Sequence, residues 1–284
     1  MDNILESINP FGRAQKIYCL IIGLIVSITG SGFYSSVFYI AEPELKCETE
    51  NFNNFNNSNT NVCAMWKNLT KSLLSNQKSV YSCQFKDEYY NLTLVNHLNL
   101  VCDKQYLLSM SQTIFFIGSI CSVVNGVISD RIGRKKSCVF FVAIYTLALI
   151  INQILVIDLL FEMSNTSKFV VYCVFQFISG FLNYCVFSVA YVLLFELITE
   201  PYRIPLSNAY VYFFVFGEFF VMLSFYVTKN YLWTNWILAI YSSISLVLFW
   251  IVVPESPKYV ENAFIFYIQE GKKLARMSCF QPLK

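Results

Sequence analysis

The segment Gly126–Lys136 reads GVISDRIGRKK and lies between two long apolar stretches, Leu107–Ser129 and Cys138–Leu160. Each stretch is long enough to cross a lipid bilayer as a helix. The segment is therefore predicted to be a tight hairpin between two membrane helices. Positive charge favours the cytoplasmic side of a membrane. The hairpin is expected to lie on that side because of its basic residues, Arg131, Arg134, Lys135 and Lys136.

Three further residues of this segment have expected mechanical roles. Gly126 and Gly133 are expected to permit a close helix contact and a tight turn, since glycine has no Cβ. Asp130 can pair with the nearby arginines and can face the N-terminus of a neighbouring helix, where the helix dipole favours a carboxylate. The segment thus combines tight geometry with paired charge.

The composition places the chain in a membrane. Of its 284 residues, 56% are hydrophobic and only 13% are charged, which leaves too little polar surface for a soluble domain. The formal net charge of +2 points to no nucleic-acid partner. With a single histidine, no nucleophile motif and no phosphate-binding loop in the sequence, neither an enzyme, a cofactor nor a metal site is expected.

Six apolar runs are long enough to span a bilayer core of about 30 Å. They are predicted to be helices, because backbone polar groups in hydrocarbon must satisfy one another. The expected fold is all-α, with spans at Ile17–Ile40, Tyr106–Ser129, Cys138–Leu160, Phe169–Phe195, Tyr210–Thr228 and Trp236–Val253.

Alternation from a cytoplasmic segment 1–16 assigns a side to every connection. The inside segments are then 130–137, 196–208 and 254–284, and the outside segments are 41–105, 161–168 and 229–235. Lys and Arg concentrate in the inside segments, whereas each short outside loop carries one, Lys168 and Lys229. Both termini are thus expected in the cytoplasm of a multi-pass protein of the plasma membrane or an endomembrane.

The long outside loop is predicted to carry disulfides and glycans. An even number of cysteines in an oxidising compartment indicates two disulfides with three possible pairings, among Cys47, Cys63, Cys83 and Cys102. A zinc site is the alternative, but paired C-x-x-C spacing is missing and His97 is expected to be a solvated loop residue. Glycosylation sequons fall outside at Asn56, Asn68, Asn91 and Asn165.

The hairpin pattern G-x-x-x-D-R-x-G-R-K-K resembles the loop 2–3 signature of the major facilitator superfamily of transporters. Four further stretches are similar to the organic cation and organic anion transporters of the solute carrier 22 family. They are Phe11-Gly12…Gln15 with Glu42-Pro43…Cys47, Leu98–Cys102 (LNLVC), Tyr191…Glu196…Arg203, and Val253–Tyr259 (VPESPKY). The last stretch also resembles sugar porters, whereas the long loop ending in LNLVC favours the organic-ion carriers. The resemblance covers nearly the whole chain, but only the N-terminal half of a twelve-span fold.

The resemblance implies a charge network that closes the inner gate when the carrier faces outward. Its members would be Gly126, Asp130, Arg131, Gly133, Arg134, Lys135, Glu196, Arg203, Glu255 and Lys258. The alternative is a positively charged anchor and solvated helix ends with no gating role. A second half or a homodimer partner would have to supply the facing wall of the cavity.

The resemblance also indicates substrate-path positions at Phe33, Phe187 and Tyr191, where aromatic faces suit organic cations. Tyr184 replaces a lysine that some relatives carry. Glu218 lies in the middle of a span, where a charge is costly unless it faces a cavity or a partner. It is a candidate for pairing with a cation or titrating with a proton; a purely structural hydrogen-bonding role is the alternative.

The predicted function is transport of small organic ions, cations above all, by alternating access within a major facilitator carrier. Two alternatives stay open: a non-transporting membrane protein that binds partners, and a sugar-porter-like facilitator.

Overall fold

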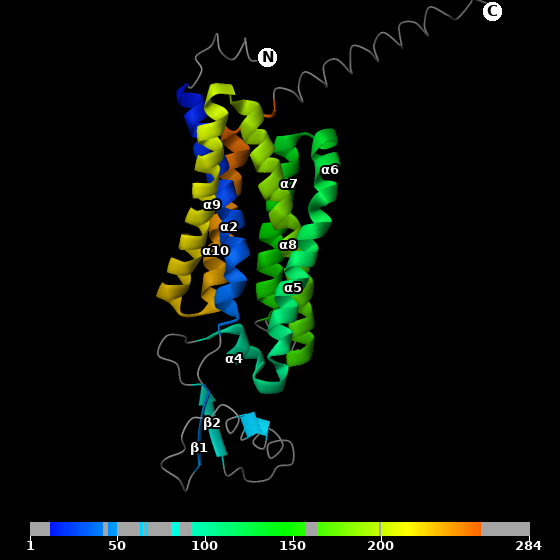
Figure 1. The fold of residues 1–284 in the computed structure, drawn as a ribbon, viewed down its shortest axis with the longest axis vertical. Helices are drawn as coiled ribbons and strands as arrows, with labels where there is room; N and C mark the ends of the chain where they lie inside the picture. The colour runs from blue at the N-terminus through cyan, green and yellow to red at the C-terminus, as the bar shows by residue number, and fades with distance from the viewer. Residues whose placement is uncertain are drawn as a thin grey trace, which may run out of the picture.

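The computed structural model describes residues 12–41, 45–49, 63–64, 66–67, 81–85, 92–156, 164–198 and 200–256, with the backbone alone for 45–49 and 81–85. Within these residues, six helical stretches are long and apolar enough to cross a membrane. They run roughly parallel to one axis (Figure 1). Their bounds are α2 Arg13–Tyr39, α5–η2–α6 within Cys102–Ile132, α7 Arg134–Val156, α8 Asn165–Leu197, α9 Glu200–Thr228 and α10 Tyr231–Val252. The predicted all-helical, six-span fold class is confirmed.

The second stretch is not one regular helix. It consists of α5 (Tyr106–Cys121), the 3₁₀ turn η2 (Ser122–Val124) and α6 (Asn125–Ile132). At the break, the Asn125 side chain donates to the backbone oxygen of Cys185 at 3.0 Å and to the Ser188 hydroxyl at 2.7 Å, both on α8. These bonds tie the break to the neighbouring helix.

The connections at one end of the bundle are shorter than the sequence indicates. Gly133 alone separates α6 from α7, where a loop over 130–137 was expected. The expected 196–208 loop is likewise reduced, since α8 ends at Leu197 and α9 begins at Glu200. Pro201 lies in the first turn of α9, where its missing N–H has no intrahelical partner to lose. Polar helix ends outside hydrocarbon have no apolar signature, so the sequence pattern stops too early.

Helix α8 begins inside the connection predicted over 161–168, because its first residues are polar. Helix α8 already begins at Asn165, with the Ser164 side chain accepting a hydrogen bond from the backbone N–H of Ser167. This is an N-cap, which stabilises a helix start by about 1 kcal/mol.

Two helix pairs approach each other closely through glycine. A Cβ at Gly30 of α2 would collide with the Phe214 carbonyl of α9, and a Cβ at Gly217 of α9 would collide with the Ser27 carbonyl of α2. Lipid gives helices no hydrophobic reason to associate, so such small-residue contacts are a main source of stability in membranes.

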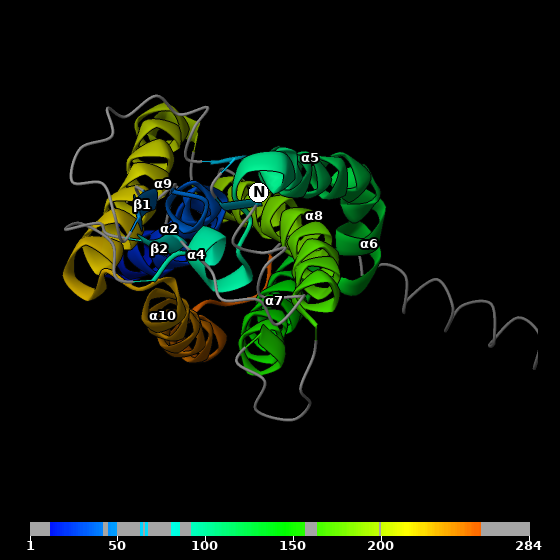
Figure 2. The ribbon, with the colours of Figure 1, turned by 90° about the horizontal axis from the view of Figure 1, so that it is seen from below.

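The pair α5 and α8 repeats this arrangement. Gly118 of α5 lies against the Phe177 carbonyl, and Gly180 of α8 lies against the Phe115 carbonyl. Each of these four helices therefore contributes both a glycine and a carbonyl to the contact, and the glycine stands three residues after the residue that bears the carbonyl. Figure 2 shows the resulting groups, with α2, α9 and α10 on one side and α5, α7 and α8 on the other.

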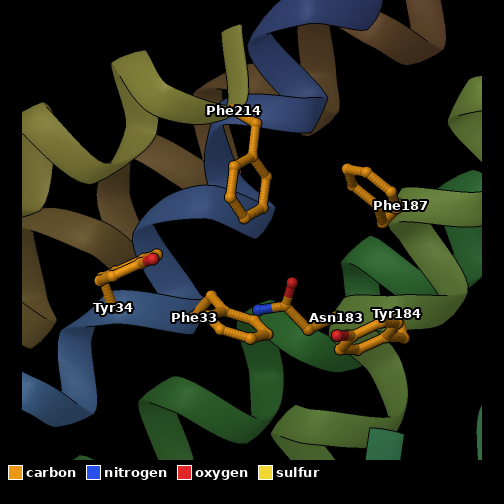
Figure 3. Close-up of a pocket in the computed structure, with 6 residues that line it drawn as sticks. All are labelled: Phe33, Tyr34, Asn183, Tyr184, Phe187 and Phe214. Carbon is orange, nitrogen blue, oxygen red and sulfur yellow. The ribbon is translucent and has the colours of Figure 1, made fainter. Parts of the chain in front are cut away.

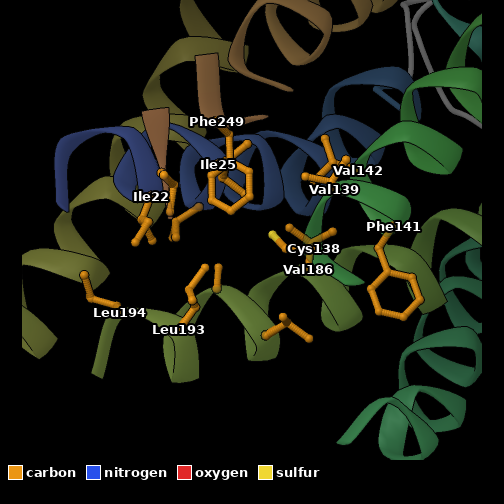
Figure 4. Close-up of a cluster of buried hydrophobic side chains, with 14 of the residues drawn as sticks. Ile22, Ile25, Cys138, Val139, Phe141, Val142, Val186, Leu193, Leu194 and Phe249 are labelled. Atoms are coloured by element: carbon orange, nitrogen blue, oxygen red, sulfur yellow. The ribbon is translucent and has the colours of Figure 1, made fainter. Parts of the chain in front are cut away.

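One buried apolar cluster holds the two groups together (Figure 4). It joins Ile22 and Ile25 of α2, Val142 of α7, Leu193 of α8 and Phe249 of α10, none more than 1% exposed. A second buried cluster, which includes Tyr39, Leu98 and Tyr231, lies at the end of the bundle where the returning 92–105 segment packs. We call this end the loop end.

The predicted loop 41–105 contains two short strands, β1 (Leu45–Thr49) and β2 (Tyr81–Phe85), which pair antiparallel. The segment then returns through α4 (Leu94–Leu98) and the 3₁₀ turn η1 (Cys102–Lys104). The backbone N–H of Leu92 donates to the Lys229 carbonyl at 3.2 Å, and the Leu92 carbonyl accepts from Tyr231 N–H at 3.1 Å. The end of the loop is therefore attached to the turn between α9 and α10.

Candidate functional site

Arg134 is the centre of a charge cluster at the end of the bundle opposite the loop. Its Nε lies 2.8 Å from Oε2 of Glu196 on α8, and its Nη2 lies 2.9 Å from Oδ1 of Asp130 on α6. The Ser256 hydroxyl donates to the same Glu196 oxygen at 2.6 Å. The predicted pairing of Asp130 with an arginine is present, and one guanidinium joins three elements. We call this end the charged end.

The two acids differ sharply in exposure. The Glu196 side chain is 8% exposed, whereas that of Asp130 is 62% exposed; Arg134 is intermediate at 20%. Coulomb attraction is screened less where water is excluded. The Arg134–Glu196 contact is consequently the stronger of the two.

Glu255 caps the N-terminus of α7. Its Oε1 accepts from the backbone N–H groups of Lys135 at 2.8 Å and Ser256 at 3.3 Å. A carboxylate is favoured there by the α7 dipole. Gly133, with φ of +107°, lets the chain turn beneath the carboxylate, as expected for this glycine.

The remaining members of the predicted network have different surroundings. Arg203 lies within α9, where its Nη1 is 3.4 Å from Oε1 of Glu200. Arg131 is exposed on α6, and Lys258 lies outside the described residues. The expected close helix contact at Gly126 is wrong for the described part of the chain, because a Cβ there would meet nothing within 4 Å. Gly126 lies on the exposed face of α6.

A pocket of about 180 Å³ lies between the two helix groups (Figure 3). It is lined by Phe33, Tyr34, Asn183, Tyr184, Phe187 and Phe214, from α2, α8 and α9. Five of these six side chains are aromatic and none is charged. Phe33 and Phe187, both predicted for the substrate path, are among them.

Ring contacts fix the pocket wall. The ring centroid of Phe33 lies 6.0 Å from that of Tyr184 and 6.2 Å from that of Phe214. Phe187 packs edge-on against Phe214, with 5.6 Å between centroids. Edge-to-face contacts of this kind add about 0.5–1.5 kcal/mol beyond burial.

The other two path candidates do not line this pocket in the described structure. Tyr191 packs on Tyr210, and Tyr210 packs on Phe187, each pair with 5.1 Å between ring centroids. Tyr191 is therefore one ring removed from the wall. Glu218 lies one turn beyond Phe214 on α9 and is partly exposed.

The loop cysteines pair in part as predicted. Cys63 and Cys102 form a disulfide across 39 residues of sequence. The strand register places Cys47 opposite Cys83. Neighbouring strands hold such positions close enough for a disulfide, so this register predicts the second pair.

His97 is not the solvated residue that was expected. It lies on α4, half-buried, and its Nδ1 shares a hydrogen bond with the Tyr231 hydroxyl of α10. Among the described residues, no group of three or more His, Cys, Asp or Glu side chains could hold a metal ion. Of the predicted glycosylation positions, Asn165 is exposed at the start of α8; Asn56, Asn68 and Asn91 lie outside the described residues.

Sequence reasoning missed the polar residues inside the spans. Tyr39 donates to Oδ1 of Asn235 at 2.7 Å, and Asn235 donates to Oε1 of Gln153 at 3.1 Å, which ties α2, α10 and α7 together. Asn183 in the pocket wall was missed as well. A signal was available, because an amide within an apolar run must find a partner or a cavity.

Comparisons with known proteins agree with this architecture. The family model described as "Sugar (and other) transporter" matches residues 22–266. An organic cation transporter protein of Drosophila melanogaster is 23% identical over 96% of this chain and 52% of its own length. The human organic cation/carnitine transporter 2 is 25% identical over 91% of this chain and 50% of its own length. The chain thus spans about half the length of the curated relatives it matches.

A solved structure shows the same fold. The crystal structure of a D-xylose–proton symporter matches with a TM-score of 0.51 and 16% identity, over 91% of this chain and 53% of that one. These relatives are membrane transporters and not enzymes, and six apolar helices make this an integral, multi-pass membrane protein. The chain belongs to the sugar (and other) transporter family of the major facilitator superfamily, with a solute carrier family 22 member of Mus musculus among its relatives, as its motifs predicted.

Proposed function

We propose that this chain forms one six-helix half of a carrier that moves small organic ions, cations above all, by alternating access. The observation that carries the proposal is the aromatic, uncharged pocket between the two helix groups. Aromatic faces attract organic cations through the ring quadrupole, by about 0.5–2 kcal/mol for each well-placed ring. The names of the relatives, organic cation transporters, support the same substrate class.

The charged end is the proposed inner gate. Arg134 joins Asp130, Glu196 and, through the shared Glu196 oxygen, Ser256. Contacts of this kind can hold one end of a bundle closed while the other end is open. The basic residues of the hairpin favour a cytoplasmic position for this end, with both termini on that side.

Asp130 offers a test of gating that is separate from folding. Since its side chain is 62% exposed, Asp130→Asn should leave the fold nearly unchanged. If Asp130 contacts a second half during gating, the variant should transport more slowly at normal surface expression. Uptake equal to wild type would remove the gating role.

Glu218 is proposed as an accessory acid of the transport path. It lies on α9 near Phe214 and does not line the pocket in the described structure. A partner half packed on α9 could bring it to a shared cavity, where it would pair with a cation or exchange a proton. Glu218→Gln uptake that matches wild type in rate and pH dependence would contradict this role.

The facing wall of the cavity would come from a second six-helix half or from a second copy of this chain. If a second copy supplies this wall, proteoliposomes that contain only the purified chain should show saturable uptake of tetraethylammonium and counterflow. Phe33→Ala should lower uptake, because it removes a ring from the pocket. Phe140→Ala, a change at a 56% exposed residue of α7, is the matched control. Uptake that is linear in concentration and equal in both variants would exclude a carrier built from copies of this chain alone; the same result after a second half is added would favour the alternative, a non-transporting membrane protein that binds partners.

A further inference from the structure

Asn183 is the one non-aromatic side chain among the six that line the pocket. It lies on α8, three residues after Gly180, and is only 4% exposed. Figure 3 shows its amide extending from α8 toward Phe33, between the rings of the pocket. The amide is therefore both buried and directed at the space that a bound molecule would fill.

The Nδ2 donors of Asn183 have no hydrogen-bond partner among the described residues. A buried donor without a partner costs about 1–3 kcal/mol. Gly32 of α2 lies against this nitrogen, and the Tyr145 hydroxyl lies beside the same glycine without forming a hydrogen bond to the amide. Buried polar groups are nearly always satisfied in proteins, so an unsatisfied donor in a pocket wall points to a partner supplied by the occupant.

Close packing holds the amide in place. A Cβ at Gly32 of α2 would collide both with Nδ2 of Asn183 and with the Tyr145 hydroxyl of α7. Glycine at this position thus lets three helices meet around the amide group. A donor held this way is preorganised, which reduces the entropy lost when a ligand binds.

We propose that Asn183 donates a hydrogen bond to an oxygen of the transported molecule. The pocket then selects organic molecules that carry a carbonyl, ether or hydroxyl oxygen beside a flat or cationic body. This inference rests on the proposed function, and it narrows the substrate class. The rings of Phe33, Phe187 and Phe214 hold the body, and Asn183 recognises the oxygen.

A matched pair of probes tests the proposal by equilibrium binding to the purified chain in detergent micelles. One probe is 1-methylnicotinamide, a cation with a carboxamide oxygen. The other is 1-methyl-3-isopropylpyridinium, which has the same ring and charge but no acceptor. Asn183→Leu, which is similar in volume, should weaken binding of the first probe about five- to tenfold and leave the second within about twofold.

Two further variants guard against misfolding. Asn183→Asp keeps the shape but replaces the donor with an acceptor, and should also discriminate against the first probe. Asn152→Leu changes another buried asparagine with an unpartnered atom, on α7 and away from the pocket lining, and should affect both probes equally. Retained binding of the acceptor-free probe shows that a variant is folded.

The outcomes distinguish a failure of the hydrogen bond from a failure of the proposed function. If wild type binds both probes but Asn183→Leu weakens neither, or weakens both equally, the hydrogen bond to an oxygen is refuted while the proposed function stands. If wild type binds neither probe, the proposed function fails at this pocket and the inference falls with it.

Discussion

Arg134→Ala should be among the most destabilising single changes at the charged end, and the structure gives its magnitude. The substitution leaves Glu196, 8% exposed, without its cation. Breaking a buried ion pair costs about 3–5 kcal/mol, because the remaining charge is uncompensated. Arg134 is itself 20% exposed, and Ser256 still donates to Glu196 at 2.6 Å. We therefore expect a loss near the lower limit, about 3 kcal/mol.

Asp130→Asn removes the other partner of the same arginine and should cost far less. Asp130 is 62% exposed and four residues from Arg134 on the chain. Exposed ion pairs contribute about 0.2–1 kcal/mol. The loss for Arg134→Ala should thus be at least about threefold larger than the loss for Asp130→Asn, although both changes alter the same cluster.

The assay is unfolding of the purified chain by SDS in mixed micelles, followed by circular dichroism. Arg131→Ala, at an exposed position of α6, serves as the control and should lie within about 0.5 kcal/mol of wild type. The double variant Arg134→Ala with Glu196→Gln should be more stable than Arg134→Ala alone, since it no longer leaves an unpaired charge. Equal losses for Arg134→Ala and Asp130→Asn, or no recovery in the double variant, would refute the reasoning.

Two further changes test the packing and the loop. Gly30→Ala should destabilise the bundle by about 1–3 kcal/mol in the same assay, because its Cβ collides with the backbone of α9. Gly126→Ala, whose Cβ meets nothing within 4 Å, should be neutral or slightly stabilising. Similar losses for both variants would contradict the close α2–α9 contact. Cys63→Ser should break the bond to Cys102 and release a loop of 39 residues, which lowers stability by about 4 kcal/mol in the chain-entropy account and slows migration on a non-reducing gel. Unchanged migration with and without reductant in wild type would rule out this pairing.

The helices could be predicted from the sequence because apolar length is a strong signal in a membrane protein. The helix ends could not, because Arg134 and Lys135 are polar and helical at once. What makes them helical is the cap from Glu255, which is 120 residues away from Lys135 in sequence. A contact of that kind leaves no local pattern.

Only some residues of the pocket could be predicted from the sequence. Phe33 and Phe187 were found through resemblance, since aromatic residues are too common here for pattern alone to select them. Glu218 was selected as a charge at mid-span, yet it does not line the pocket in the described structure. Asn183 carried the same kind of signal, a polar group within an apolar run, and it does line the pocket. The cost of placing a polar group in hydrocarbon holds for amides as well as for charged side chains.

The repeated glycine contacts explain why the pocket forms where it does. Gly30 and Gly180 hold equivalent positions in the two helix pairs, each against a carbonyl of its partner helix. Three and four residues later, α2 presents Phe33 and Tyr34, and α8 presents Asn183 and Tyr184.

These four residues line the same pocket. Structural repeats within each half are common in carriers of this superfamily, and substrate sites lie where repeats meet. Four of the six lining residues thus come from positions that the glycine contacts make equivalent. At these positions both helices carry a tyrosine, and they differ only in Phe33 of α2 and Asn183 of α8. If binding depended on aromatic contacts alone, Asn183→Phe would make the α2 and α8 sides of the pocket alike and would leave the preference between the two probes unchanged. We expect it instead to abolish the preference for oxygen-bearing probes while the acceptor-free probe still binds.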